Sequence, residues 1–240
     1  MKTRLLLSLI LIVFISGCTQ KVNSDGLMKK VSFFTVDEVT LVGNYWKGSD
    51  TAVLLLHMMP ATKESWNVFA DALNKEGMTV LAIDLRGHGE SVKQNNNVLD
   101  YHRFSDAEHQ ATIKDVEASI AYLKQQGITK IYIVGASIGA NLALQYQSEH
   151  PEIEKTVLLS AGLNYHGIIT EPFARKLKGN QKVFLVAGTM DGTTSETVST
   201  LSNLIKGEKQ VKIYETSAHG TDLFNVAPNL ISQLVDWLKN

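Results

Sequence analysis

Hydrophobic residues occur along most of this chain in short uninterrupted runs, without regular alternation with polar residues. Such runs are typical of strands buried on both faces of a parallel sheet. Between them lie stretches with apolar residues at helical spacing, notably 63–75 and 106–125. The strands predicted in this way cover 52–56, 79–83, 131–134, 156–159, 183–187 and 211–214. Strands that alternate with helices predict an α/β fold with a mostly parallel sheet and helices on both faces.

The remaining segments of the chain predict a hairpin at the start, three further helices and one short connection. The runs 31–36 and 39–46 flank Asp37-Glu38 and predict an opening antiparallel hairpin. Further helices are predicted after residue 137 to about 148, near 194–205 and at 222–239. The stretch 161–182 has room for a loop or one short helix, but not for a large cap domain. Residues 31–240 therefore form one predicted domain, and its site is expected at the carboxyl ends of the strands.

The first residues have the pattern of an export signal. Lys2 and Arg4 precede an apolar run at 5–15, which is too short for a membrane-spanning helix. The sequence Ile15-Ser16-Gly17-Cys18 resembles the lipobox of bacterial lipoproteins. The resemblance implies a signal peptide at 1–17, lipidation of Cys18 and attachment outside the cytoplasm to a membrane of the cell envelope. A polar tether would follow at 18–30. An uncleaved anchor, or a plain signal with a chance cysteine, are the alternatives.

Composition excludes several classes of function. The 240 residues contain 23 Lys and Arg against 24 Asp and Glu, a formal net charge of −1. Without a basic excess, nucleic acid is not an expected partner. A single cysteine forms neither an intramolecular disulfide nor a thiolate metal cluster, and no HExxH motif is present. The sequence therefore predicts no metal and no cofactor.

A candidate nucleophile lies between an apolar run and a helical stretch. Gly135-Ala136-Ser137-Ile138-Gly139 is a G-x-S-x-G motif that follows the predicted strand at 131–134. A nucleophile elbow requires this strand–turn–helix context, because small neighbours let strand and helix approach closely around a strained serine. The alternative is a glycine-rich turn in which Ser137 only caps the helix.

A serine hydroxyl needs a neighbouring base, and histidine with a carboxylate partner supplies one near neutral pH. His219 follows the last predicted strand and Asp191 the one before it, so both lie beyond strand ends. Rival carboxylates for orienting His219 remain; they are Asp84, Asp222 and Glu215. Four further histidines are expected to be surface or local hydrogen-bonding groups; they are His102, His109, His150 and His166.

The chain order Ser137, Asp191, His219 is that of the α/β-hydrolases, and from about residue 31 onward the chain resembles a small serine hydrolase of the esterase and lipase type. The segment Asp84-Leu-Arg-Gly-His-Gly-Glu-Ser91 resembles a loop that supports the site in this family without supplying a triad member. His88 would then be structural.

The resemblance also implies an oxyanion hole. His57-Met58-Met59-Pro60 follows the strand at 52–56 and matches the family's His-Gly-x turn, with Met58 where glycine is usual. By position, the amides of Met59 and Ile138 would be the two donors. Glycine accepts backbone angles that are costly for methionine, so either the turn is reshaped or Met58 is strained. The methionines are expected to line an apolar acyl pocket.

The predicted function is hydrolysis of carboxylic esters with small or medium acyl groups, through an acyl-enzyme on Ser137. A thioesterase or peptidase would use the same residues. A non-catalytic envelope lipoprotein with an inherited binding cleft is the alternative from another class. The sequence does not decide among these substrates, nor does it give the oligomeric state.

Overall fold

The computed structural model describes residues 28–240. The predicted signal peptide and Cys18 therefore lie outside the described residues. A hairpin opens the fold, with β1 (Lys29–Phe34) antiparallel to β2 (Val39–Trp46). The strand β1 thus takes in the last two residues of the stretch predicted to be a tether, and it ends two residues before the predicted boundary.

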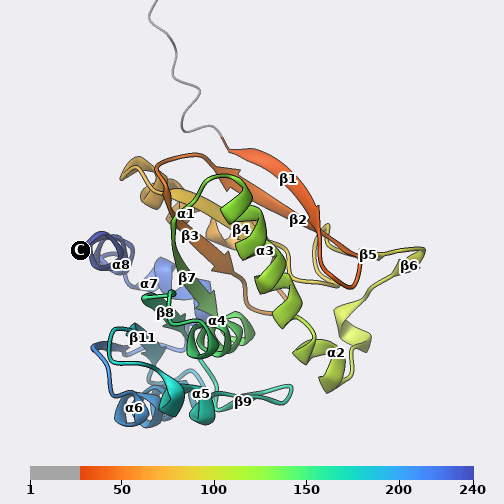
Figure 1. The fold of residues 1–240 in the computed structure, drawn as a ribbon. Coiled ribbons are helices and arrows are strands. Elements are labelled where there is room, and N and C mark those ends of the chain that lie inside the picture. Colours follow the sequence, from red (N-terminus) through yellow and green to blue (C-terminus); the bar gives the residue numbers. More distant parts are fainter. Residues whose placement is uncertain (1–27) are drawn as a thin grey trace, which may run out of the picture.

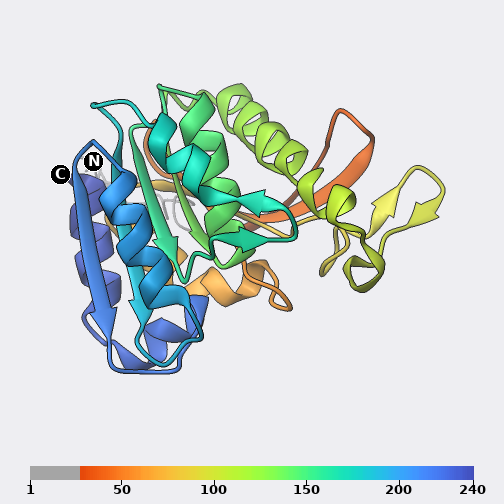
Figure 2. The ribbon, with the colours of Figure 1, turned by 90° about the horizontal axis from the view of Figure 1, so that it is seen from below.

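A parallel sheet follows, as the uninterrupted apolar runs predict. Its strands are β3 (Thr51–Leu56), β4 (Thr79–Ile83), β7 (Lys130–Ala136), β8 (Lys155–Leu159), β11 (Lys182–Gly188) and β12 (Lys209–Tyr214). Across the sheet the order is β12-β11-β8-β7-β3-β4-β2-β5-β6, where β5 (Lys93–Gln94) and β6 (Asn97–Val98) form a small hairpin that sequence reasoning missed. This hairpin projects from one end of the molecule, and β12 lies at the other (Figures 1 and 2).

Helices cover both faces of the sheet (Figure 1). On one face, α3 (Ile113–Gln125), α4 (Ile138–Glu149), α5 (Thr170–Lys176) and α6 (Thr194–Leu204) enclose one hydrophobic cluster. On the other, α1 (Asn67–Lys75) and α8 (Leu230–Lys239) enclose a second. The central strands are buried on both sides, so most of their apolar surface contributes to stability. The α/β fold with a mostly parallel sheet is therefore confirmed.

Three predicted helices are interrupted in the structure. The stretch 63–75 begins as a 3₁₀ turn, η1 (Lys63–Trp66), before α1. The stretch 106–125 divides into α2 (Asp106–Gln110) and α3 at Ala111 and Thr112, which lets the two helices contact different neighbours. The last one becomes η3 (Gly220–Asp222), α7 (Leu223–Val226) and α8, because Pro228 interrupts the hydrogen-bond ladder.

The connection at 161–182 is small, as predicted. It contains a two-stranded hairpin, β9 (Asn164–Tyr165) with β10 (Ile168–Ile169), followed by α5. This segment forms no large cap domain. Within residues 28–240, no helix has the length and apolar character needed to cross a membrane.

Candidate active site

Ser137 lies in the tight turn between β7 and α4, at the carboxyl end of a central strand. Its φ of 53° and ψ of −119° are costly for a residue with a side chain, and backbone strain of this kind gathers at active sites. The Ser137 N–H donates to the Leu159 carbonyl at 2.8 Å, which joins the turn to β8. The Ser137 hydroxyl makes no cap hydrogen bond to α4. Helix capping therefore does not account for the serine.

Both glycines of the motif are required by contacts with backbone atoms. A Cβ at Gly135 would lie 2.1 Å from the Gly139 oxygen, and a Cβ at Gly139 would lie 2.3 Å from the Leu56 oxygen. Because these partners are backbone carbonyls, they have little room to move. The motif spacing thus brings β7, α4 and β3 close together, with Ser137 at their junction.

His219 and Asp191 lie beyond the ends of β12 and β11 and are directly bonded. The His219 Nδ1 lies 2.8 Å and 2.9 Å from the two Asp191 carboxylate oxygens. The Thr194 hydroxyl donates to the same carboxylate at 3.0 Å and helps to hold it. With Nδ1–H donating to Asp191, Nε2 of His219 is left to accept a proton, and it has no hydrogen-bond partner among the described residues.

The structure pairs His219 with Asp191, not with the rival carboxylates. Asp84 is fully buried and accepts hydrogen bonds from the Lys63 ammonium and the Lys63 and Glu90 backbone amides. It therefore supports the 84–91 loop, as the resemblance implies. Asp222 and Glu215 are exposed, and neither makes a contact with His219 like that of Asp191.

The backbone next to His219 lies close to the Ser137 turn. A Cβ at Gly220 would lie 3.2 Å from the Ala136 Cβ, and the Gly220 N–H donates to the Ser160 hydroxyl at 2.9 Å. In the part of the chain that the structure describes, Ser137 and His219 share no direct hydrogen bond. Catalytic hydrogen bonds are often long without substrate and shorten when it binds.

Tyr165, on the small β9–β10 hairpin, is a neighbour of Ser137 that sequence reasoning did not single out. Burial raises the pKa of Tyr165, and the nearby Ser137 side chain opposes that rise. The Tyr165 hydroxyl also donates to the Ser160 carbonyl at 3.4 Å. No motif surrounds Tyr165, so its position depends on how the hairpin folds back.

The predicted oxyanion turn is held by a buried, neutral His57. Its Nε2 accepts a hydrogen bond from the Leu85 N–H at 3.0 Å, so its Nδ1–H donates to the Met58 carbonyl at 2.9 Å. Burial lowers the pKa of His57 to about 4, which keeps the ring neutral near pH 7. The Met58 carbonyl and the Met59 N–H belong to one planar trans peptide and point in opposite directions. The hydrogen bond from His57 to the Met58 carbonyl therefore also orients the Met59 N–H. Within residues 28–240 neither the Met59 nor the Ile138 amide has a partner.

Met58 does not adopt the backbone conformation that would favour glycine, because its φ is not positive. Among the described residues, the non-glycine positions with positive φ do not include it; they are Glu38, Asn95, Ser137, Ser160 and His166. The Met58 sulfur instead occupies the space beside Gly220, 2.4 Å from where a Cβ would stand. Met58 thereby packs between the oxyanion turn and the His219 loop, whereas Met59 lines a cavity.

With this geometry described, comparison with known proteins identifies the family. The sequence model for the alpha/beta hydrolase fold matches residues 51–178, more than half of the chain. The chain belongs to the α/β-hydrolase family.

Among curated proteins, this α/β-hydrolase is 34% identical over 130 residues to a bifunctional esterase/perhydrolase of Acinetobacter calcoaceticus, a match that covers 53% of this chain and 43% of that protein. It is 30% identical over 124 residues to a thermostable monoacylglycerol lipase of a Bacillus species, covering 52% and 46% respectively. The matches therefore span less than half of these relatives' lengths.

A solved structure with a similar fold is an esterase of Pyrococcus furiosus, with a TM-score of 0.71 and 21% identity over 89% of this chain and 91% of that one. At this identity the likeness concerns the fold alone.

Most of the remaining histidines of the hydrolase agree with expectation. His88 is structural as predicted: its Nδ1 lies 3.0 Å from the Arg86 carbonyl and its ring stacks on Tyr101. His150 is a surface residue stacked on Tyr146, also as predicted. His102 and His166 are exposed and pair with Asp100 and Asp106, also as predicted, whereas His109 is buried and not a surface residue. These three histidines line a common cavity with Met59. Across residues 28–240 no group of three or more His, Cys, Asp or Glu side chains is arranged to hold a metal ion.

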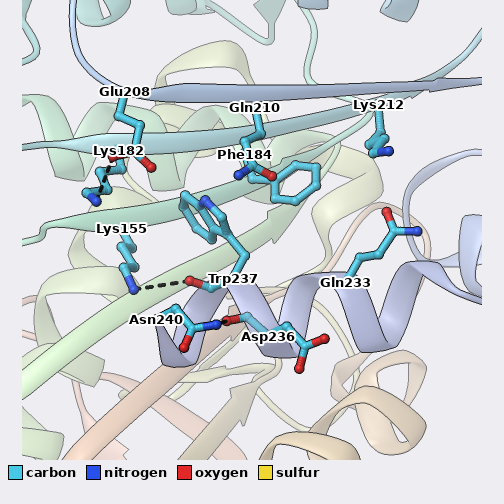
Figure 3. A pocket seen from close by; sticks show the side chains of 10 residues that line it. All are labelled: Lys155, Lys182, Phe184, Glu208, Gln210, Lys212, Gln233, Asp236, Trp237 and Asn240. Carbon is cyan, nitrogen blue, oxygen red and sulfur yellow. Dashed lines mark hydrogen bonds and ion pairs between the residues drawn. The ribbon is translucent and has the colours of Figure 1, made fainter.

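A larger cavity, of about 510 Å³, lies away from Ser137 between the sheet edge and α8 (Figure 3). Lys155, in its wall, donates to the Trp237 and Leu238 carbonyls at 3.1 Å and 3.0 Å. These carbonyls belong to the last turn of α8, where a cation is favourable. The lining comes from the beginnings and middle parts of β8, β11 and β12. The cavity is therefore distinct from the site at the carboxyl ends.

Proposed function

We propose that this α/β-hydrolase cleaves carboxylic esters of small or medium acyl groups, with Ser137 as nucleophile, His219 as base and Asp191 as its orienting carboxylate. The observation that carries the proposal is the strained Ser137 at the end of a central strand, beside the loop of His219, which is bonded to Asp191 on the neighbouring loop. The esterase and lipase names among the relatives support the same reaction class.

The reaction would proceed in two acyl-transfer steps. The Ser137 hydroxyl loses its proton to His219 Nε2, and its oxygen forms a bond with the ester carbonyl carbon. The amides of Met59 and Ile138 donate to the oxyanion that develops. His219 then returns the proton to the departing alkoxide, and the C–O bond breaks. A water molecule, deprotonated by His219, attacks the acyl-enzyme and releases the carboxylic acid and free Ser137.

The choice of small or medium acyl groups follows from the short connection at 161–182. A hairpin and a helix of 7 residues provide little material to enclose a long lipid chain. Thioesters and peptides would present the same carbonyl to the same residues. Whether the leaving group is an alcohol, a thiol or an amine is therefore decided by the substrate panel below.

The test is a substrate panel on the wild-type protein and the Ser137→Ala variant. We expect the wild type to cleave 4-nitrophenyl acetate and butyrate faster than the dodecanoate, and the variant to lose ester turnover by at least about 10⁴-fold. Faster cleavage of thioesters or peptides would redirect the assignment to those substrates. Equal rates for wild type and variant would overturn the nucleophile and favour a non-catalytic binding protein.

We also propose that the hydrolase is attached through lipidated Cys18 to a membrane of the bacterial cell envelope, outside the cytoplasm. The support is the charged start, the apolar run and the single cysteine at its end. Two or more acyl chains give stable attachment, whereas one chain is marginal. We expect metabolic labelling with an alkyne fatty acid to mark the wild type and not Cys18→Ser. Labelling of both proteins would contradict the assignment.

A further inference from the structure

A cavity of about 200 Å³ opens beside the oxyanion donor Met59, and its walls are mostly flat rings. Apart from Met59, every lining residue has an aromatic or imidazole side chain; they are Tyr101, His102, Phe104, His109 and His166. Tyr101 and His102 come from η2 (Tyr101–Arg103), His109 from α2, and His166 from the turn between β9 and β10. The fold thus gathers rings from three separate segments next to the site.

These rings are held in two stacked groups. In the first, the Tyr101 ring centroid lies 3.8 Å from that of His88 and 3.9 Å from that of His102. In the second, the ring centroids of His109 and His166 lie 3.9 Å apart, and Phe104 meets His109 edge-on at 5.4 Å. His109 is buried, whereas the His102 side chain is 71% exposed, so the second group is the more firmly held wall of the cavity.

Hydrogen bonds fix the second group further. The Gln110 amide donates to the His166 carbonyl at 3.2 Å, and His166 Nδ1 lies 3.3 Å from the Asp106 carboxylate. His109 is only 4% exposed. Since α2 ends at Gln110, the break between α2 and α3 places His109 on a short helix of its own.

The position of the cavity indicates which half of an ester it receives. His219 must lie near the oxygen of the leaving group, because it returns the proton there. The lining of the cavity includes neither His219 nor any residue from the loops that carry Asp191 and His219. It does include Met59, whose amide faces the carbonyl oxygen in the proposed function. The acyl group extends from the carbonyl carbon on the side away from His219, so the cavity beside Met59 receives the acyl half of the ester.

We propose that this cavity is the acyl subsite and that it selects planar aromatic acyl groups of one ring. This inference rests on the proposed function and specifies its substrate class. Aromatic rings interact favourably with stacked and edge-on rings, and a thioether adds a favourable contact with a ring. A cavity of about 150 Å³ holds one benzene ring in another protein, so this one has room for a ring with small substituents. It is smaller than the roughly 300 Å³ at which pockets for drug-sized ligands begin.

The experiment compares two esters that differ only in the ring of the acyl group. The 4-nitrophenyl esters of 3-phenylpropanoic and 3-cyclohexylpropanoic acid share a leaving group and have similar intrinsic reactivity. We expect the wild type to cleave the phenyl ester with at least about a fivefold higher kcat/KM, since each favourable ring pair contributes roughly two- to tenfold. The preference should fall toward one in Phe104→Leu and in Tyr101→Leu, and remain in Phe104→Tyr.

A matched control is available at Phe34, which is 70% exposed on β1 and does not line the cavity. Phe34→Leu makes the same chemical change and should keep the phenyl preference. Thermal unfolding of each variant checks that the fold is retained, and Tyr101→Leu replaces Phe104→Leu if the latter is unfolded.

The outcomes separate the two proposals. If the wild type cleaves 4-nitrophenyl acetate but shows a ratio near one for the ring pair, the aromatic subsite is wrong and the esterase stands. An unchanged ratio in folded Phe104→Leu and Tyr101→Leu would overturn the subsite in the same way. If the wild type cleaves no ester at all, the proposed function itself fails.

Discussion

The two turns that would supply the oxyanion donors solve the same geometric problem in opposite ways. At the Ser137 turn, the backbone is strained and both flanking glycines face carbonyls at 2.1 Å and 2.3 Å from a Cβ position. At the Met58–Met59 turn, no residue has a positive φ, and the geometry depends on hydrogen bonds made by the buried His57 side chain.

The difference shows when a glycine is replaceable. Glycine is indispensable where neighbouring backbone fills the space of a Cβ, as at Gly135 and Gly139. Glycine is dispensable where the side chain of the preceding residue holds the peptide group by a hydrogen bond, as His57 does at the Met58 carbonyl. The methionine in place of the family's usual glycine is therefore compatible with a donor at Met59.

The largest effect is expected at the crowded turn. Gly135→Ala should lower the free energy of unfolding by at least about 3 kcal/mol and remove esterase activity, because the new methyl group collides with the Gly139 carbonyl. Urea unfolding measures the loss. Gly179→Ala is the matched control, since its Cβ would meet nothing within 4 Å, and it should be neutral or slightly stabilising. Equal effects for the two variants would show that the contact at Gly135 is unimportant.

The buried imidazole at the other turn should make stability depend on pH. Burial lowers the pKa of His57 to about 4 from 6.5, so as pH falls the unfolded chain binds the proton first. The neutral ring's contribution is therefore lost between pH 6.5 and about 4, and it amounts to roughly 3 kcal/mol.

The decisive quantity is the slope of unfolding free energy against pH in that range, which His57→Gln should make shallower. His150→Gln, at a half-buried surface histidine, is the control and should leave the slope unchanged. His88, whose pKa burial also lowers to about 4, contributes to the slope that remains in His57→Gln. An unchanged slope in that variant would contradict a neutral His57.

A smaller effect is expected on the rate. His57→Leu removes the hydrogen bond to the Met58 carbonyl, so the Met59 amide loses its fixed direction. We expect kcat to fall about 10- to 100-fold with little change in KM, part of the roughly 10²- to 10³-fold cost of losing a whole oxyanion donor. Steady-state kinetics with 4-nitrophenyl acetate gives both parameters. A raised KM at unchanged kcat would show that His57 acts on substrate binding instead.

The smallest effect is predicted at Met58. Because Met58 has no positive φ, Met58→Gly relieves no strain and loses the packing against Gly220. We expect a loss of about 1–2 kcal/mol in unfolding free energy and a kcat within about threefold of wild type. Met58→Ala, which keeps a Cβ, separates the loss of packing from the added backbone freedom. A rise in kcat of tenfold or more in Met58→Gly would show that the methionine restrains the turn.

Local patterns were enough to predict most of the fold and part of the site. The uninterrupted apolar runs predicted the parallel strands, and the order Ser137, Asp191, His219 placed all three residues at carboxyl ends of strands. The bond between His219 and Asp191 agrees with that order. These features depend on the period of hydrophobic residues and on motifs confined to a few positions.

Features that depend on contacts between distant segments were not predictable. Tyr165 reaches Ser137, and His166 stacks on His109, only because the hairpin at 164–169 folds back over the site. The helix break at Ala111 and Thr112 lacks glycine or proline, so no local signal marks it. His57 orients the Met59 amide only in the tautomer that carries its proton on Nδ1. That tautomer is defined by the Leu85 N–H, which follows β4 and donates to His57 Nε2.

The account depends most on Ser137 being an activated nucleophile served by His219. The direct measurement is labelling of the protein with a fluorophosphonate probe, followed by mass spectrometry of its peptides. We predict one adduct in the wild type, on Ser137. The rate of labelling should fall by orders of magnitude in His219→Ala and to a lesser degree in Asp191→Ala. An adduct on another residue, or an unchanged labelling rate in His219→Ala, would contradict the claim that His219 activates Ser137 as the nucleophile.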